Sequence, residues 1–295
     1  MMTLTQALTQ AEKDGVAIAH FNFSELTTLQ ACWQAVLELS KAAGRPIPVI
    51  FGVSEGEAKA VGAREAVRMI SSLRAEHNHP VFINADHHKS LEACTAAIDA
   101  GFDSVIIDAA DKSFDENVRI TKVVAEYARA SSNKQVLIEG EIGYIGSGSQ
   151  LLDALPAGAV LTEDKLPTVE QVASFVQQTG INLLAPAVGN IHGMLKNAPN
   201  PHLFIEKIKE YRTAAGVPLV LHGGSGTPDE DFVQAVKAGI RIVHISTELR
   251  RAWRAGIESA LNTHPNEVAP YKLLESAHAG IKDVAMNRLR LFTQL

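Results

Sequence analysis

The sequence predicts an α/β fold of the (β/α)8 TIM-barrel type. Eight short runs of β-branched and other apolar residues alternate with amphipathic stretches along the 295 residues, which is the pattern of repeated strand-and-helix units. Several amphipathic stretches begin at a capping residue and end at a glycine, such as Gly44 and Gly101. Because no change in composition divides the chain, we expect one TIM-barrel domain over residues 1–295.

In chain order, the apolar runs are assigned to strands and the amphipathic stretches between them to helices. The predicted strands cover residues 16–22, 48–53, 81–87, 104–109, 135–143, 181–189, 218–224 and 240–247. The predicted helices cover residues 26–43, 90–100, 116–129, 169–179, 202–214 and 229–238. An open doubly wound sheet is the alternative, but no Gly-x-Gly-x-x-Gly turn follows the first strand, as a dinucleotide site would require.

Two segments depart from this alternation. Residues 144–165 contain the run Gly-Ser-Gly-Ser at 146–149 and are longer than an ordinary loop between a strand and a helix. Because they follow a strand that carries candidate site residues, we expect an active-site lid loop, with a disordered insertion as the alternative. Residues 262–295 hold one more helical pattern, at 273–291, which we expect to close the barrel or to form an oligomer interface.

Composition and charge exclude several classes of protein. A net charge of -6 and an isoelectric point near 6.0 provide no basic excess for a nucleic-acid partner. The apolar stretches are shorter than the roughly 18 residues of a membrane span, and the first residues lack a signal-peptide pattern. We therefore expect a cytoplasmic protein without a membrane partner. Cys32 and Cys94 have no partner spacing and are expected to be reduced core residues.

Three histidines follow buried-strand patterns and point to a metal site. His87 comes after Asp86 at the end of the third predicted strand, and His192 and His222 each follow an apolar run and precede glycine. The carboxyl ends of parallel barrel strands meet at one mouth, and three imidazoles with one open position suit catalytic zinc. For a single buried histidine, a structural role is the alternative, and the other histidines are expected to have that role. His88 remains ambiguous because adjacent strand residues face opposite sides.

Carboxylates at the same strand ends provide candidates for proton transfer. Asp86 stands beside a metal-ligand histidine, where it can move a proton in cleavage or formation of a carbon-carbon bond next to a carbonyl. Its alternative role is to orient a histidine. Asp108 ends the fourth strand, and Glu139 and Glu141 share one face of the fifth. These acids either hold a second cation or form an ion pair inside the barrel.

A glycine-rich loop after the seventh predicted strand indicates an anion site. His222 is followed by Gly223, Gly224 and Ser225 and then by a helix, so that backbone N–H groups and the helix dipole can meet a phosphate. TIM barrels often bind phosphate after strands seven and eight. Hydroxyl groups of Ser246 and Thr247 and the charge of Lys196 would complete the site. A tight turn that needs glycine only for its own geometry is the alternative.

Together these residues resemble the class II, metal-dependent family of fructose-bisphosphate and tagatose-bisphosphate aldolases. The resemblance extends over nearly the whole chain, and so many matches in order are specific. The matching segments are residues 19–22, 52–56, 86–87, 100–108, 114–118, 139–143, 189–193, 221–226 and 247–250.

The resemblance implies roles for individual residues. Zinc would be bound by His87, His192 and His222 and would polarise the ketone of dihydroxyacetone phosphate, which stabilises its enediolate, while Asp86 would transfer the proton on the aldehyde-derived oxygen. The other matched positions are Asp108 and Glu141 for alternative metal binding, Ser54 for a carbonyl contact, and Gly193, Lys196, Gly224, Ser225, Ser246 and Thr247 for phosphate. The resemblance also implies a homodimer or homotetramer.

The chain departs from the family pattern at the groups that move protons and at the distal phosphate. His244 stands where the family has a substrate-orienting Asn, and residues 146–150 lack the acid of the family lid. Tyr271 aligns with the arginine that meets the distal phosphate, and a neutral phenol cannot replace such a clamp. Candidates to replace the lid acid are Asp153, Glu163 and Asp164. Alanine and aspartate at 110–111 replace the family Ser-His.

These features favour a metal-dependent aldolase that cleaves or forms a ketose 1-phosphate, with fructose 1,6-bisphosphate not the preferred substrate. Two alternatives stay open. One is a non-catalytic, aldolase-like subunit that keeps metal and anion binding. The other is a metal-dependent lyase or epimerase that uses His244 as its acid or base.

Overall fold

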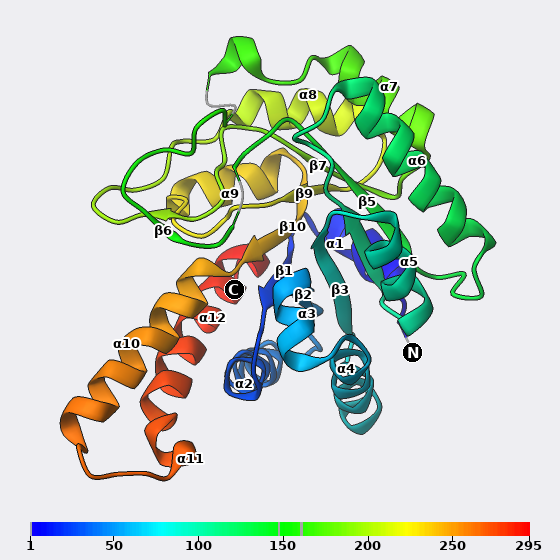
Figure 1. Cartoon of the computed structure of the whole chain (residues 1–295). Coiled ribbons are helices and arrows are strands. Elements are labelled where there is room, and N and C mark those ends of the chain that lie inside the picture. Colours follow the sequence, from blue (N-terminus) through cyan, green and yellow to red (C-terminus); the bar gives the residue numbers. More distant parts are fainter. Residues whose placement is uncertain (1, 147, 160–161) are drawn as a thin grey trace.

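A computed structural model of the chain describes residues 2–146, 148–159 and 162–295 and has a closed barrel of parallel strands at its centre (Figure 1). Around the barrel the order is β1, β10, β9, β7, β5, β4, β3 and β2, so that barrel strands consecutive in the chain lie side by side. The prediction of a (β/α)8 TIM barrel is confirmed. The barrel strands are β1 (Ile18–Asn22), β2 (Val49–Ser54), β3 (Val81–His88), β4 (Ser104–Ile107), β5 (Leu137–Ile142), β7 (Leu183–Pro186), β9 (Leu219–Leu221) and β10 (Ile240–Ile245).

The observed strands differ from the predicted ones mainly at their carboxyl ends. The strand predicted for 181–189 ends at Pro186, and the one predicted for 218–224 ends at Leu221. Beyond these ends the chain turns at glycines with positive φ, including Gly189 at +94° and Gly223 at +61°. Such angles suit glycine and end the extended conformation. The site residues after β7 and β9 therefore lie on loops that leave the sheet.

Helices surround the barrel, and all six predicted helices are present. Side-chain caps fix several of their first turns: Ser90 accepts from the Ala93 N–H and Thr168 from the Gln171 N–H. Among the outer helices, α3, α4, α10 and α11 are additional to the predicted set. The outer helices are α2 (Leu26–Ala43), α3 (Glu55–Val61), α4 (Ala63–His77), α5 (Leu91–Ala100), α6 (Phe114–Ala130), α7 (Val169–Thr179), α8 (Ile205–Ala215), α9 (Asp229–Ala238), α10 (Thr247–Thr263), α11 (Pro270–Leu273) and α12 (Glu275–Thr293).

Side chains inside the barrel form layers, because alternate strand residues face the same side. At the amino end the layer is apolar and is covered by a further helix, α1 (Leu4–Asp14). Two residues further along five of the strands, the layer is polar and buried. The apolar layer includes Leu4, Ala7, Leu8, Ala11, Ile18, Ile50, Phe82, Leu137, Val220 and Ile242. The polar layer includes His20, Asn84, Glu139, His222 and His244.

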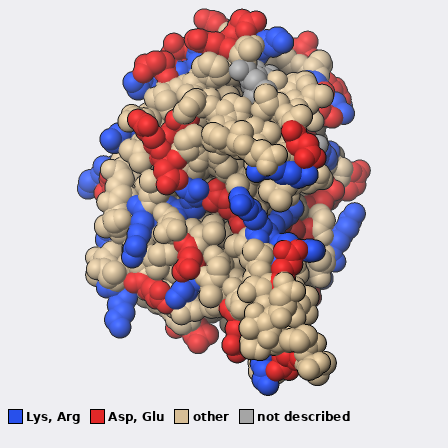
Figure 2. Space-filling view, turned by 90° about the vertical axis from the view of Figure 1, so that its left-hand side faces the viewer, with Lys and Arg blue, Asp and Glu red and all other residues tan. Residues whose placement is uncertain are grey.

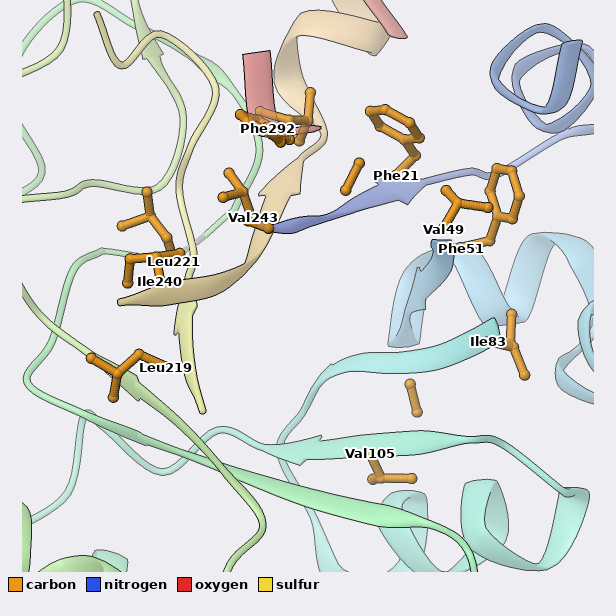
Figure 3. Close-up of a cluster of buried hydrophobic side chains, with 14 of the residues drawn as sticks. Phe21, Val49, Phe51, Ile83, Val105, Leu219, Leu221, Ile240, Val243 and Phe292 are labelled. Atoms are coloured by element: carbon orange, nitrogen blue, oxygen red, sulfur yellow. The ribbon is translucent and has the colours of Figure 1, made fainter. Parts of the chain in front are cut away.

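A second, larger apolar core lies between the outside of the barrel and the helices. Figure 3 shows part of it, with Phe21 and Phe51 from β1 and β2 and with Val243 from β10 near Phe292 of α12. These strand residues alternate with the inward-facing ones, as expected for a barrel that is buried on both faces. Helix α1 is held in place by charge as well, since Glu12 accepts from Arg212 at 2.8 Å and from Arg241 at 2.6 Å.

Helices α10 and α12 form a hairpin that extends away from the barrel at the lower left of Figure 1, with α11 near its tip. The two helices cross closely at Gly256, where a Cβ atom would lie 2.3 Å from the Ala277 Cα. Near its end α12 returns to the barrel, and the Phe292 carbonyl accepts from the Ala17 N–H at 3.0 Å. The helix predicted for 273–291 corresponds to α12, which spans Glu275–Thr293.

The segment 144–165 has regular structure in its described parts. Its two-residue strand β6 (Leu151–Leu152) pairs with β8 (Met194–Leu195), which follows β7, and a single turn of 3-10 helix covers Glu163–Lys165. Residues 147, 160 and 161 lie outside the described residues. Over the described part of the chain, every helix is too short or too polar to cross a membrane. Charges of both signs are interspersed on the face shown in Figure 2.

Candidate active site

The three histidines singled out by the sequence lie together at the carboxyl end of the barrel. His87 belongs to β3, His192 follows β7 and His222 follows β9. His87 has a φ of +47°, which is uncommon for a residue with a side chain. The pairing of β3 with β4 shifts register between Ala85 and His88 at the same place. The backbone is therefore locally distorted where His87 reaches the mouth.

One nitrogen of each ring points to a common centre. The Nε2 atom of His87 lies 2.9 Å from the His192 Nε2 atom and 2.8 Å from the His222 Nδ1 atom. Zinc-nitrogen bonds of about 2.0–2.1 Å place tetrahedral donors roughly 3.3 Å apart, so a small outward movement of the rings would admit an ion. These residues are one of the groups whose ligand atoms lie within 4.8 Å of one another.

The second nitrogen of each ring is tied to the protein. His87 Nδ1 lies 3.1 Å from the Asp108 carboxylate, His192 Nδ1 lies 2.9 Å from the Gly146 carbonyl, and His222 Nε2 lies 2.5 Å from the Glu139 carboxyl group. Such contacts fix the tautomer and orientation of a metal-binding imidazole. In all three rings the nitrogen that faces the centre is therefore available as a ligand, and these residues fit a metal ion.

Burial and neighbouring charge set the protonation of these groups. Burial lowers the pKa of His192 and of His222 to about 3, with the charge of His87 adding to the effect. For His87 burial acts in the same direction, but Asp86 and Asp108 outweigh it and raise the pKa to about 10. Two of the three rings are therefore neutral near pH 7, which is the form that binds metal.

Glu139 and Glu141 both face the site, as their spacing on the strand predicts. Burial and the charge of Asp86 raise the pKa of Glu139 to about 8, and burial together with Asp108 raises that of Glu141 well above its usual range. Glu141 Oε2 lies 3.8 Å from His87 Nδ1. His87, Asp108 and Glu141 thus form a second group of converging donors beside the histidine triad.

Asp86 faces the triad with one oxygen and is anchored by the other. Its Oδ2 atom accepts from the Asn22 amide at 2.8 Å. Its Oδ1 atom lies 3.2 Å from His244 Nδ1 and 3.9 Å from His87 Nε2, and it has no hydrogen-bond partner among the described residues. Burial opposes ionisation of Asp86, but the charge of His87 and contact with His244 keep its pKa well below the usual value.

His244 is stacked on His20, which the sequence assigned to an ordinary core role. The ring centroids are 3.5 Å apart and the planes differ by 8°. His20 Nε2 accepts from the Asn84 amide at 3.1 Å, and burial lowers the pKa of His20 to about 4. His20, Asp86 and His244 also converge, but two parallel stacked rings cannot both aim in-plane lone pairs at one ion. This group is therefore an orienting cluster around Asp86, which sequence reasoning missed.

All of the candidate phosphate residues except Lys196 line one small cavity with the triad, Asp86 and His244. The glycines are required by close backbone approach: a Cβ at Gly223 would lie 2.1 Å from the Ile191 carbonyl oxygen and one at Gly224 2.7 Å from the His244 carbonyl oxygen. The Ser225 hydroxyl accepts from the Ser246 N–H at 3.1 Å. The cavity-lining residues from this set are Gly193, Gly223, Gly224, Ser225, Ser246 and Thr247.

Lys196 is not among the described residues that line this cavity. It forms an exposed ion pair with Asp153 at 2.8 Å. Asp153 is therefore occupied by a lysine, while Glu163 lies 3.9 Å from Lys207 on α8. The acids proposed to replace the lid acid are also absent from the described lining of the cavity. Tyr271 lies on α11 and is 71% exposed.

A second cavity adjoins the first and opens at the mouth of the barrel. It is lined by Ser54 at the end of β2 and by Gly148 and Ser149 of the loop after β5. Lys89 and Arg250 are its basic residues among those described, and both have acidic neighbours: Lys89 Nζ lies 3.9 Å from Asp108 and Arg250 donates to Glu57 at 2.6 Å. His88 points away from both cavities' linings, toward the Ala93 carbonyl of α5.

Comparisons with known proteins agree with this geometry. The sequence profile described as "Fructose-bisphosphate aldolase class-II" matches residues 2–294. The fructose-bisphosphate aldolase of Geobacillus stearothermophilus is 35% identical over 295 residues, covering 99% of this chain and 96% of that protein. The probable fructose-bisphosphate aldolase of Bacillus subtilis (strain 168) is 34% identical and covers 99% and 97%. The solved structure of the YdjI aldolase from Escherichia coli K12 has a TM-score of 0.79 and 27% identity, covering 99% and 97%.

These similarities extend over the barrel, the loops at its mouth and the carboxyl-terminal helices. They confirm the resemblance that the ordered sequence motifs indicated. The family is generally zinc-dependent and acts on phosphorylated sugars, and the histidine triad is consistent with that chemistry. The chain belongs to the class II fructose-bisphosphate aldolase family and is an aldolase, a lyase of carbon-carbon bonds.

Proposed function

We propose that this aldolase cleaves or forms a ketose 1-phosphate by breaking or making the carbon-carbon bond between dihydroxyacetone phosphate and an aldehyde that carries no phosphate. The observation that carries the proposal is the convergence of His87, His192 and His222 beside the free oxygen of Asp86. A metal site next to a carboxylate oxygen that has no hydrogen-bond partner among the described residues suits proton transfer near a polarised ketone.

The metal would be one zinc ion per subunit, held by His87 Nε2, His192 Nε2 and His222 Nδ1. When bound, zinc acts as a Lewis acid toward the ketone oxygen of the substrate. Asp108 and Glu141 would hold the ion in an alternative position or bind a second cation, since both carboxylates lie near His87 Nδ1. The stacking of the orienting cluster argues against a further ion between His20 and His244.

The phosphate of dihydroxyacetone phosphate would lie in the small cavity. Backbone groups of Gly193, Gly223 and Gly224 and the hydroxyl groups of Ser225, Ser246 and Thr247 line it. The buried Ser246 hydroxyl has no partner among the described residues, so a ligand oxygen would satisfy it. Lys196 would join the site only after release from Asp153.

Proton transfer would be carried out by Asp86, with His244 as a neighbouring imidazole. The 3.2 Å approach of His244 Nδ1 to Asp86 Oδ1 supports this pairing. Ser54 would contact a substrate carbonyl from the adjoining cavity. The short distance also keeps open a lyase or epimerase reaction in which His244 is itself the acid or base. A His244→Asn variant with higher aldolase activity than the wild type would favour reassignment of this position.

The distal end of the substrate would lie in the adjoining cavity. Its two basic residues, Lys89 and Arg250, already face Asp108 and Glu57, and a second phosphate needs uncompensated charge. Tyr271, which aligns with the arginine that meets the distal phosphate in the family, has a neutral phenol and is not among the described residues that line this cavity. These features support poor use of fructose 1,6-bisphosphate.

Segment 144–165 would act as the lid. The Gly146 carbonyl contacts His192, and Ser149 lines both cavities. The hairpin of α10 and α12 would serve assembly into a homodimer or homotetramer, because Leu261, Val268 and Tyr271 are exposed on it. The lobe at the bottom of Figure 2 has few charged side chains.

Hydrogen-deuterium exchange tests the proposal. Zinc-loaded protein in deuterated water is expected to exchange a carbon-bound proton of dihydroxyacetone phosphate for deuterium. In a second assay, a screen of unphosphorylated aldehydes, it is expected to condense one of them with dihydroxyacetone phosphate. A metal-loaded protein without exchange would favour a non-catalytic subunit. Efficient cleavage of fructose 1,6-bisphosphate would contradict the specificity.

A further inference from the structure

Asp86 is the end of a line of hydrogen bonds that reaches the rim of the adjoining cavity. The amide nitrogen of Asn22, at the end of β1, donates to Asp86 Oδ2 at 2.8 Å and to Glu57 Oε2 at 3.0 Å. The other oxygen of Glu57 accepts from Arg250 Nη2 at 2.6 Å. The members of this line come from β1, β3, α3 and α10, which the barrel closure brings together.

The geometry leaves the Asn22 side chain only one orientation. Its nitrogen faces two carboxylates and has two hydrogens, so that each hydrogen serves one carboxylate. Rotation of the amide would place its oxygen against both acids and would lose both hydrogen bonds. Asn22 and Glu57 are buried, at 6% and 5% exposure. Asn22 therefore holds Asp86 Oδ2, and Glu57 holds Asn22.

Helix capping explains only part of the placement of Glu57. The carboxylate accepts from the Ser54 N–H at 2.8 Å and completes the capping box of α3. That role needs neither Asn22 nor Arg250. A buried carboxylate is costly unless it is paired, and Arg250 supplies the charge from a side chain that is 46% exposed. Arg250 Nη1 also donates to the Ser149 carbonyl at 3.1 Å, in the wall of the adjoining cavity.

We propose that Glu57 is a positioning residue for proton transfer: through Asn22 it fixes the carboxylate of Asp86 so that Oδ1 faces the triad, and Arg250 neutralises and holds Glu57. This proposal rests on the proposed function, in which Asp86 moves the proton on the aldehyde-derived oxygen. It makes catalysis depend on Glu57, although among the described residues the carboxylate of Glu57 accepts from Asn22, Ser54 and Arg250 and not from the triad.

The first test is Glu57→Gln in the full-length, zinc-loaded protein. The partners of the Glu57 carboxylate are all donors, and the NH2 group of glutamine is a donor too. It would face either Arg250 or the N–H groups of Asn22 and Ser54, so the hydrogen bonds on one of these two sides must be lost. With dihydroxyacetone phosphate and D-glyceraldehyde as probes, we expect kcat for condensation to fall by about 10- to 100-fold. KM, zinc content and deuterium exchange into dihydroxyacetone phosphate should stay near wild type, because these do not depend on the orientation of Asp86.

A matched control is Glu12→Gln, which removes a carboxylate paired with two arginines at the opposite end of the barrel. It should leave kcat unchanged. Arg250→Ala provides a second variant that changes a half-exposed side chain and should fold. It is expected to lower kcat with little change in KM. A rise in KM with kcat unchanged would mean that Arg250 contacts the substrate directly, and the assigned role would be wrong.

A double-mutant cycle separates positioning from an independent effect. If Glu57 acts through Asp86, the variant with both Glu57→Gln and Asp86→Asn should condense the probes no more slowly than Asp86→Asn alone. Multiplied losses would overturn the proposal, as would Glu57→Gln with wild-type kcat. A wild-type protein that catalyses neither exchange nor condensation would overturn the proposed function and with it this proposal. An active wild-type protein with an unaffected Glu57→Gln variant would overturn only the role of Glu57, so the two failures can be distinguished.

Discussion

The two ends of the barrel interior differ in chemistry although the same strands build both. At the amino end Val220 of β9 and Ile242 of β10 pack under α1, and two residues later the same strands have led to His222 and to His244. The apolar layer has nothing to orient and gains stability from buried area. The polar layer is buried as well, so its groups must satisfy one another or a ligand.

This difference separates stability from chemistry. Hydrogen bonds in the polar layer fix rings and carboxylates for a reaction. Among the described residues, His244 Nδ1 and His20 Nδ1 of this layer have no hydrogen-bond partner, and neither has the neighbouring Asp86 Oδ1. The side chains of this layer are also closely packed. A Cβ at Gly52 would lie 2.2 Å from the His20 ring, so the glycine in β2 makes room for the histidine stack. Substitutions at the mouth should therefore mainly alter activity, and substitutions at the amino end should mainly alter stability.

The largest effect on activity is expected from His192→Ala. Its ring supplies one of three donors that converge at the mouth, and Lewis-acid stabilisation of several kcal/mol corresponds to about a 1,000-fold loss or more in kcat/KM. Zinc content per subunit, measured by atomic absorption after dialysis, should fall with activity. Retained zinc and activity would show that the triad is not the metal site. His202→Ala is the matched control, because that ring is 82% exposed and pairs with Asp231.

Asp86→Asn should have the next largest effect. The amide keeps the size of the carboxylate but cannot accept the proton, so kcat for condensation is expected to fall by about 100- to 10,000-fold. Zinc binding and deuterium exchange should persist, because the triad is intact. Loss of zinc in this variant would instead assign Asp86 a role in orienting the histidines.

Glu139→Gln tests the support of the triad from the polar layer. The Glu139 carboxyl group lies 2.5 Å from His222 Nε2, and removal of such a partner lowers metal affinity by about 10- to 100-fold. Competition with a chelator would measure the change, and saturating zinc should restore most of the activity. Unchanged affinity would mean that the contact serves only to bury Glu139.

The sequence was sufficient for the parts of the site that follow from strand ends. His87, His192 and His222 could be located because parallel strands end at one mouth, and Glu139 and Glu141 because strand side chains have a period of two. Contacts across the barrel closure could not be predicted in this way. The stack of His20 on His244 depends on the register of β1 against β10.

The same limit applies to residues brought together by loops and helix ends. Asn22 was part of a recognised motif, yet nothing in the sequence relates it to Glu57, or relates Glu57 to Arg250, which lies 193 residues after it. Lys196 was assigned to phosphate from its charge and from the family resemblance, but the pairing of β6 with β8 places it near Asp153. Helix α1 was missed because the first predicted unit began with a strand, and its role as a cover for the apolar layer is a property of the closed barrel.

The smallest effect on activity is expected from Leu8→Ala in α1. Leu8 is 3% exposed and packs in the apolar layer, where loss of a buried leucine costs about 2–5 kcal/mol of unfolding free energy. Urea denaturation should show that loss, while kcat, KM and zinc content of the folded variant at 25 °C stay near wild type. The apolar layer separates Leu8 from the polar one, so a change confined to the amino end leaves the triad and Asp86 in place. A Leu8→Ala variant that lost zinc while still folded would show that the two layers are coupled, and the separation of stability from chemistry along the barrel axis would be wrong.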